Sequence, residues 1–326
     1  MLNRLVALAA SAGLAVALAL AGTNAEAAYP DKPLRLIVPW APGGSTDAIA
    51  RALSQRLSQT LGQSVVVDNR SGASGQIGTD AAAKAAPDGY TLVIVEMPHA
   101  IQPAVVAKLP YDLLRDFAPV SLIGTSPLVL FANPAEHKDG DMKGFMQRAK
   151  TAGAPLAIAN SGPGSSSHLA AEVLAGSSGF KIVQVPYRGS GPALTDVASG
   201  MVAAHFATLA SGNSLYGVGK LSALMITGAS RLPALPAVPA AREVGIDGMD
   251  FNQWWALVAP AATPIDIVER LRAEVGAALA HPATRERLDA LGIELKGSTR
   301  EALGSFMRDE VQRWGAIARR AGVKPE

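Results

Sequence analysis

Short apolar segments alternate with segments of helical period along the first third of the chain, and this alternation constrains the fold most strongly. Each apolar segment is short and rich in branched residues, with Pro or Gly within a few residues of at least one end, which is typical of a buried strand. The predicted strands are Leu34–Val38, Val65–Val67 and Thr91–Val95. The segments between them predict helices from Ile49 to Leu61, where apolar residues recur every four positions, and near 79–86. This order predicts a parallel sheet with helices on its faces.

The same alternation restarts in the second third of the chain. The long apolar stretch Phe117–Phe131 suits a strand that leaves one lobe and enters another, and Trp254–Ala259 suits a strand that returns. Further strands are predicted at Leu156–Ala159, Lys181–Val185, Ala203–Ala207 and Leu221–Thr227. We therefore expect an α/β protein of two lobes, each an open, mostly parallel sheet with flanking helices, joined by two crossing strands. The expected division is 28–128 plus 250–326 for lobe 1 and 129–249 for lobe 2.

The N-terminus has the features of a cleaved signal peptide. Arg4 precedes an apolar run from Leu5 to Gly22, and Ala25-Glu26-Ala27 has the small-x-small form of a cleavage site. We predict that 1–27 is removed and that the protein acts in the periplasm. A membrane anchor is the alternative, because the apolar run just reaches the length that spans a bilayer.

Composition narrows the classes of function. The chain contains no cysteine, which excludes disulfides, thiolate nucleophiles and thiolate metal ligands. Only 17% of its residues are charged and no cluster of Lys or Arg occurs, so nucleic acid is an unsuitable partner. No phosphate loop, dinucleotide fingerprint or paired histidine spacing is present. We expect no cofactor and no metal.

Two loops carry the residues best suited to bind a ligand. The first is Pro39–Asp47 and the second is Asn160–His168, and each is rich in Gly, Ser or Thr between a predicted strand and a predicted helix. Glycines let the backbone approach a ligand, and the exposed amides of a helix start bind an anion without a charged side chain. The two facing helix starts suit a carboxylate held from both lobes. For either loop alone, the alternative is a well-capped turn with no ligand.

Several motifs resemble those of the tripartite tricarboxylate transporter receptors, also called the Bug family. The first is Pro-Trp-Ala-Pro-Gly-Gly-Ser-Thr-Asp at 39–47. Others follow in the same order at 67–73, 86–92, 109–112, 116–120, 185–190, 192–196 and 257–261. The resemblance covers essentially the whole mature chain. It implies a two-lobed periplasmic binding protein of type II, the Venus-flytrap type, that binds small mono- or dicarboxylates, aromatic acids or related amides.

The resemblance also implies where the ligand binds. In that family the carboxylate is held by the first loop and by the loop before the second-lobe helix, through backbone amides and bridging waters. The turn Tyr187-Arg188-Gly189 would reach the far end of the ligand. The residues that we predict to bind the ligand are Trp40, Ala41, Gly44, Ser45, Thr46, Glu96, Ser161, Gly162, Ser165, Ser166, His168, Arg188, Gly189 and Thr208.

Three of these residues, Arg188, Glu96 and Trp40, keep two readings each. Arg188 is either a carboxylate clamp or a surface residue whose backbone matters. This chain departs from the family pattern at two places. At Ala207-Thr208-Leu209 it lacks an acidic residue that, in many members, helps to bind the amino group of a ligand. At Glu96 it has an acidic residue where members usually have a small or hydroxyl residue. In one reading Glu96 faces the cleft and accepts hydrogen bonds from an ammonium, amide or hydroxyl group of the ligand. In the other it is a solvated carboxylate at a strand end. Asp47 is expected to face its own helix dipole, and Trp40 either stacks on a ring or walls the pocket.

A receptor is favoured over an enzyme. Ser166 and His168 could form a nucleophile and base, but no orienting acid is evident and no Gly-x-Ser-x-Gly elbow occurs. A hydrolase is therefore the remote alternative. We expect a monomer that delivers its ligand to the membrane permease subunits of a tripartite transporter. The nearer alternative is a receptor that presents its ligand to a membrane sensor.

Overall fold

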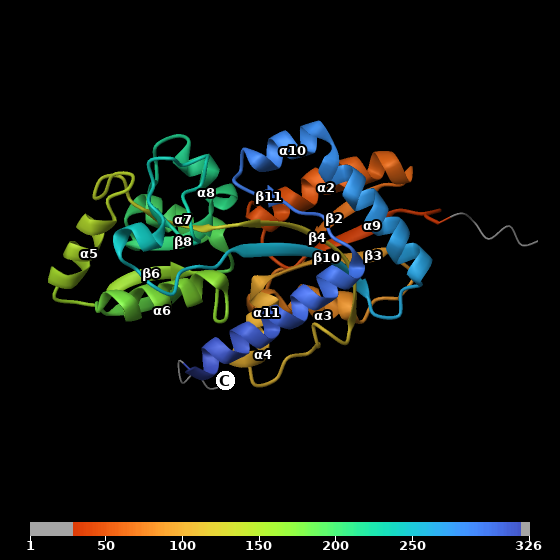
Figure 1. The fold of residues 1–326 in the computed structure, drawn as a ribbon, viewed down its shortest axis with the longest axis horizontal. Coiled ribbons are helices and arrows are strands. Elements are labelled where there is room, and N and C mark those ends of the chain that lie inside the picture. The colour runs from red at the N-terminus through yellow and green to blue at the C-terminus, as the bar shows by residue number, and fades with distance from the viewer. Residues whose placement is uncertain (1–28, 321–326) are drawn as a thin grey trace, which may run out of the picture. The chain divides into compact units, whose positions relative to one another are not determined.

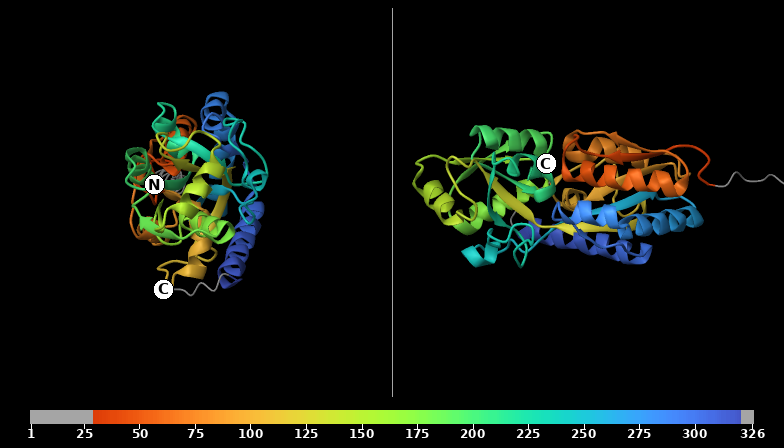
Figure 2. Two further views of the ribbon diagram at one scale, coloured as in Figure 1. Left: turned by 90° about the vertical axis from the view of Figure 1, so that its left-hand side faces the viewer. Right: turned by 90° about the horizontal axis from the view of Figure 1, so that it is seen from above.

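The computed structural model describes residues 29–320, so the predicted signal peptide at 1–27 lies outside the described residues. Residues 32–320 belong to one compact unit. It contains two β-sheets with helices on both faces of each (Figures 1 and 2). The two-lobed α/β architecture expected from the alternating pattern is confirmed.

The first lobe is built on a six-stranded sheet in the order β11-β4-β10-β3-β1-β2. Its strands are β1 (Leu34–Val38), β2 (Val65–Asn69), β3 (Thr91–Glu96), β4 (Phe117–Ser126), β10 (Gln253–Pro260) and β11 (Glu294–Leu295). Its helices are α2 (Ser45–Leu61), α3 (Gln76–Ala83), α4 (Met97–Val105), α9 (Ile265–Ala280), α10 (Pro282–Asp289) and α11 (Arg300–Arg320), with the 3-10 turn η1 (Ala73–Gly75) before α3. In Figure 1, α2, α9 and α10 lie on one face of the sheet and α3, α4 and α11 on the other.

The second lobe is built on a five-stranded sheet in the order β7-β6-β8-β5-β9. Its strands are β5 (Leu128–Ala132), β6 (Leu156–Asn160), β7 (Ile182–Pro186), β8 (Ala204–Thr208) and β9 (Ser222–Ile226). Its helices are α5 (Met142–Thr151), α6 (Ser166–Ser178), α7 (Ser190–Ser199) and α8 (Leu209–Tyr216), with the 3-10 turn η2 (Ala241–Val244) after β9.

Strand direction differs between the two halves of each sheet. The pairs β2-β1-β3 and β7-β6-β8 are parallel, as the alternation of strands and helices predicts. The pairs made by β4, β10 and β5 are antiparallel, because these strands connect the lobes instead of following a crossover helix. The apolar stretch 117–131 accordingly forms two strands, β4 and β5, that meet at Pro127 and belong to different sheets.

Most strand predictions agree with the structure to within one or two residues, whereas helices such as α4 and α8 were not predicted by residue range. Helix α4 contains Pro98 and Pro103; Pro98 stands in the first turn, where no backbone N–H is needed. Helix α8 contains Gly212 in its interior. A Cβ atom at Gly212 would lie 2.5 Å from the ring of Phe131, so this glycine permits close packing of α8 on β5.

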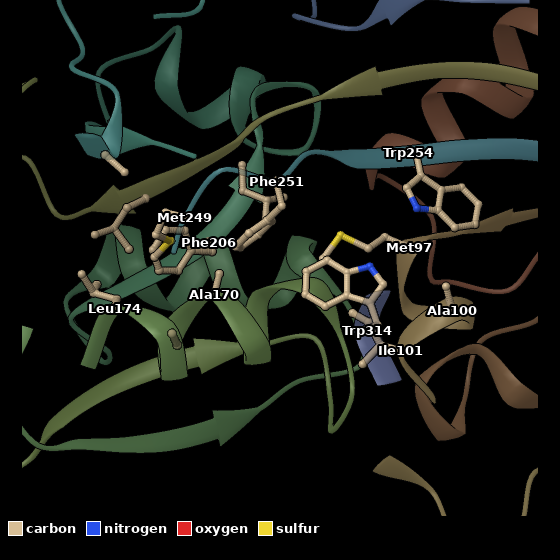
Figure 3. Packing of buried hydrophobic residues seen from close by; sticks show 14 of the residues in the cluster. Met97, Ala100, Ile101, Ala170, Leu174, Phe206, Met249, Phe251, Trp254 and Trp314 are labelled. Carbon is tan, nitrogen blue, oxygen red and sulfur yellow. The ribbon is translucent and has the colours of Figure 1, made fainter. Parts of the chain in front are cut away.

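One apolar cluster extends from the first lobe into the second. Figure 3 shows Met97 and Ile101 of α4 near Trp314 of α11, with Phe251 on the side of the second lobe. The rings of Phe251 and Trp314 meet edge to face with centroids 5.6 Å apart. The segment that leads back into β10 is thereby packed against α11, and the start of β10 is held at the boundary between the lobes.

Candidate functional site

A pocket lies at the boundary between the two lobes, where the strands end and the helices begin. Its lining includes eleven of the fourteen residues predicted to bind the ligand: Trp40, Ala41, Gly44, Ser45, Thr46, Glu96, Ser161, Ser165, Ser166, Gly189 and Thr208. The remaining lining residues are Pro98, Leu128, Ser167, Ser190, Gly191, Phe206, Ala207, Ser211 and Gln253. The two predicted loops therefore meet in one place.

Five helices begin at this pocket. The residues that precede the first turns of α2, α4, α6, α7 and α8 all belong to its lining: Gly44, Glu96, Ser165, Gly189 and Thr208. Each helix start carries unpaired N–H groups and about half a positive elementary charge. None of the described residues that line the pocket is a lysine, arginine or histidine. Within this lining, an anion can therefore be attracted only by backbone dipoles and by hydroxyl, amide or indole donors.

The first loop is held in shape by Asp47. Its carboxylate accepts hydrogen bonds from the Gly43 amide at 3.1 Å, from Arg51 at 2.9 Å and from Asn69 at 3.1 Å. Burial opposes ionisation of Asp47, but the bonds from Arg51, Gly43 and Asn69 outweigh it, and the pKa of Asp47 stays below its usual value. Asp47 is not among the lining residues. Its contacts are those of a residue that shapes the loop and the first turn of α2.

The second loop is held by its own hydroxyl and amide side chains. Ser165 Oγ accepts from the His168 amide at 3.2 Å and caps α6, while Ser167 Oγ accepts from the Ser161 amide at 2.9 Å. The side chain of Asn160 accepts from the Gly162 amide at 2.8 Å. These bonds present the start of α6 to the pocket.

A chain of hydroxyls leads from the pocket to a buried histidine. His205 Nδ1 lies 2.9 Å from the Ala159 carbonyl, which can only accept, so Nδ1 carries the proton and Nε2 accepts. The Ser190 hydroxyl, 3.1 Å from Nε2, therefore donates to it, and the Ser161 hydroxyl at 3.3 Å donates to Ser190. Burial lowers the pKa of His205 to about 4, so the imidazole is neutral at physiological pH.

Glu96 lies inside the pocket wall and is 5% exposed. Its Oε2 accepts from the Thr46 hydroxyl at 2.7 Å and from the Gln253 amide at 2.8 Å. The indole of Trp255 donates to Thr46 Oγ1 at 3.2 Å, which turns the Thr46 proton toward Glu96. Burial raises the pKa of Glu96 to about 7, although these hydrogen bonds act in the opposite direction. The reading of Glu96 as a solvated carboxylate is wrong, because the side chain is buried beside β10.

Two polar atoms at the same end of the pocket have no hydrogen-bond partner. They are Nε1 of Trp40, a donor directed at Glu96 that acts to lower its pKa without closing a hydrogen bond, and Oε1 of Gln253, an acceptor. Buried polar atoms without a partner are rare in folded proteins, and each calls for an explanation.

The other three predicted residues lie outside this lining. Gly162 and Arg188 line an adjoining hollow, which shares Trp40 and Ser161 with the pocket. His168 is half-buried, and its Nδ1 accepts from the Gly164 amide at 3.3 Å. Burial lowers the pKa of His168 below its usual value, although Glu172 acts in the opposite direction. That the three residues bind a ligand stays a prediction.

The lobes touch each other beside the pocket. The Ser45 amide in α2 donates to the Ser211 hydroxyl in α8 at 3.0 Å. A Cβ atom at Gly162, whose φ is +106°, would lie 2.6 Å from Ser74 Oγ. Ser74 itself has a positive φ of 52° and its carbonyl accepts from Gln102 at 2.6 Å. The structure thus shows the two lobes closed against each other at these points.

The set of fourteen predicted residues lacks four polar residues of the pocket: Ser167, which stands in the second predicted loop, and Ser190, Ser211 and Gln253. Ser190 stands within one of the quoted family motifs, so that motif was the available signal. Ser211 follows the predicted strand Ala203–Ala207, and Gln253 precedes the predicted strand Trp254–Ala259. Neither residue lies in a glycine-rich loop, and no local pattern distinguishes them.

Metal-binding groups and membrane-spanning helices are both absent from the described part of the chain. Within residues 29–320, no group of three or more His, Asp or Glu side chains is arranged to hold a metal ion. None of the helices in the described part of the chain is long and apolar enough to cross a membrane.

The chain is similar to proteins of one family. Residues 49–323 match the family described as tripartite tricarboxylate transporter family receptor. Protein BugT of Bordetella pertussis is 38% identical over 298 residues, which are 91% of either chain. The solved structure of the periplasmic binding protein BugD is 31% identical, with a TM-score of 0.87 over 91% of this chain and 100% of that one. Rpa4515 of R. palustris, solved with adipate, is 33% identical, with a TM-score of 0.86 over 91% and 100% of the two chains.

Proposed function

Because the chain belongs to the tripartite tricarboxylate transporter receptor family, we propose that it captures a small carboxylate in the pocket between its lobes and delivers it to a transporter. The family consists of periplasmic solute-binding receptors and not of enzymes. A relative of similar fold was solved with adipate, which supports a carboxylate ligand. We further propose that the chain is exported to the periplasm through a signal peptide at 1–27, which is then cleaved, and that it works there as a monomer.

The convergence of five helix starts on one pocket without a cationic side chain carries this proposal. An anion that enters such a pocket is stabilised by N–H groups already fixed in place, so little ordering opposes binding. A carboxylate is the anion that short hydroxyl side chains and backbone amides accommodate in a small pocket. The proposed contacts are the fourteen residues predicted above, with Ser190, Ser211 and Gln253 added.

Closure follows from the same geometry. Helix α2 belongs to the first lobe, whereas α6, α7 and α8 belong to the second. A carboxylate that contacts both sets stabilises the closed form more than the open form and shifts the population toward it. The closed form would then be recognised by the membrane permease. The lobes we propose to move are 28–128 plus 250–326 and 129–249.

The test is direct binding to purified protein that has been unfolded and refolded to remove any ligand. Isothermal titration with adipate, malate and benzoate covers aliphatic and aromatic acids. Replacement of Ser45 by Phe fills the start of α2, and we expect it to weaken binding of the preferred acid at least a hundredfold. Ser305→Phe places the same bulk on the exposed face of α11 and serves as the control. Equal affinity in the Ser45 variant and the wild type would refute the proposed site.

A further inference from the structure

We infer that the Glu96 end of the pocket binds a protonated amine carried by the same ligand whose carboxylate binds at the helix starts. The natural ligand would then be an amino-carboxylate, with opposite charges at its two ends. The inference rests on the proposed function, because it assigns the second end of the same ligand.

Charge is the first argument. Glu96 is the one ionisable side chain among the described residues that line the pocket. A buried carboxylate is costly without a cationic partner. The neighbouring elements supply none: on α4, His99 is neutral because burial lowers its pKa to about 4; on α2, Asp47 is paired with Arg51; and β10 contains no titratable residue. A cation that pairs with Glu96 must therefore come from the ligand.

The direction of the hydrogen bonds is the second argument. The Thr79 hydroxyl donates its proton to the Gly75 carbonyl at 2.9 Å. His99 Nε2 lies 2.8 Å from the same hydroxyl oxygen, so Nε2 carries a proton and donates it to Thr79 Oγ1. His99 Nδ1 is then an acceptor, and it takes the Glu96 amide at 3.0 Å. The imidazole thus binds the Glu96 backbone and leaves the carboxyl group to the pocket.

The carboxyl group and its neighbour both present acceptors. Thr46 and Gln253 both donate to Oε2 of Glu96, so Oε1 is engaged by neither of them. Gln253 spends its only side-chain nitrogen on Glu96, and its Oε1 is buried without a donor. An ammonium group offers three donors and a positive charge, and it suits both oxygens. A second carboxylate would meet the two acceptors here and a single unpaired donor, Nε1 of Trp40, whereas the helix starts offer several N–H donors.

The experiment uses matched pairs of acids that differ by one amino group. The pairs are β-alanine and propionate, 4-aminobutyrate and butyrate, aspartate and succinate, and glutamate and glutarate. Refolded wild-type protein is titrated with each at pH 8 by calorimetry. For the acids whose length fits the pocket, we expect the amino acid to bind roughly tenfold or more tightly than the acid without the amino group. The reason is that its ammonium group forms a buried ion pair with Glu96.

Variants assign the preference to the carboxyl group. Glu96→Gln keeps the size of the side chain and removes its charge, so we expect the preference for the amino acid to fall at least tenfold. The des-amino acid should change little. Glu286→Gln removes an exposed carboxylate of α10 and should keep the wild-type ratio. Should the Glu96 variant fail to fold, the wild-type pairs still decide.

The outcomes separate the two proposals. If the des-amino acids bind as tightly as the amino acids in every pair, or more tightly, carboxylate capture stands and the amine site is refuted. If Glu96→Gln retains the wild-type ratio, the amine is recognised elsewhere and the inference fails. If no member of any pair binds, the proposed capture of small carboxylates is itself wrong, and the amine site falls with it.

Discussion

Stability should depend on pH through Glu96, and the structure sets both sign and size. Burial raises the pKa of Glu96 from 4.5 to about 7 in the folded chain. The folded state therefore holds this proton more tightly than the unfolded state. The resulting stability is fully present below pH 4.5 and is lost as pH rises from 4.5 through about 7.

The magnitude follows from the two pKa values. The difference between about 7 and 4.5, multiplied by about 1.36 kcal/mol per pKa unit, is about 3 kcal/mol. Glu96→Gln cannot ionise and should escape this loss. We therefore expect the free energy of unfolding of the variant, relative to the wild type, to rise by about 3 kcal/mol between pH 4.5 and pH 8.

Urea unfolding of the ligand-free proteins, followed by tryptophan fluorescence at several pH values, measures this difference. Burial lowers the pKa of His99 and of His205 to about 4, so each destabilises the fold as pH falls from 6.5 toward 4. Both histidines are present in the two proteins, and their effects cancel in the difference. Glu286→Gln should give a flat difference. A flat or falling difference for Glu96→Gln would show that the carboxyl group is ionised at little cost, and the reasoning would be refuted.

Two other substitutions test the contacts around the pocket. Gly162→Val should weaken binding of the preferred carboxylate at least tenfold and raise the radius of gyration of the ligand-saturated protein in small-angle scattering, because a Cβ atom would meet Ser74. Unchanged scattering with unchanged affinity would contradict the observed closure. Ser190→Ala should lower the free energy of unfolding by about 1–3 kcal/mol, because Nε2 of the buried His205 loses its partner. A loss below 0.5 kcal/mol, as expected for a surface substitution, would show that His205 does not depend on Ser190.

The strands and the two loops could be predicted from the sequence because their signals are local. A branched apolar run such as Leu34–Val38 specifies a buried strand wherever the chain places it, and Gly62 ends α2 with a φ of +70°. The loops follow the same logic, since glycine and hydroxyl residues between a strand and a helix mark a capped helix start.

The environment of Glu96 could not be predicted, because it depends on pairing between distant segments. Glu96 lies opposite Trp255 in the antiparallel pair of β3 and β10. This register brings Gln253 and Trp255 to Glu96 and Thr46, although more than 150 residues separate Gln253 from Glu96 in the chain. A shift of one residue would turn the β10 side chains to the other face, and no local pattern specifies that register. The burial of Glu96 is therefore a tertiary property.

On the two proposals made above, the pocket would combine two kinds of recognition that differ in how easily they can change. The helix starts act through the backbone, so a substitution that preserves the fold leaves their attraction for a carboxylate in place. The residue at the end of β3 acts through its side chain. The backbone determines where that side chain meets the ligand, but the residue type determines which ligand group it binds. A hydroxyl at position 96 would offer a donor to a second carboxylate, whereas Glu96 offers acceptors to an amine. One substitution at this strand end can therefore change the ligand class while the carboxylate subsite and the closing contacts between the lobes remain.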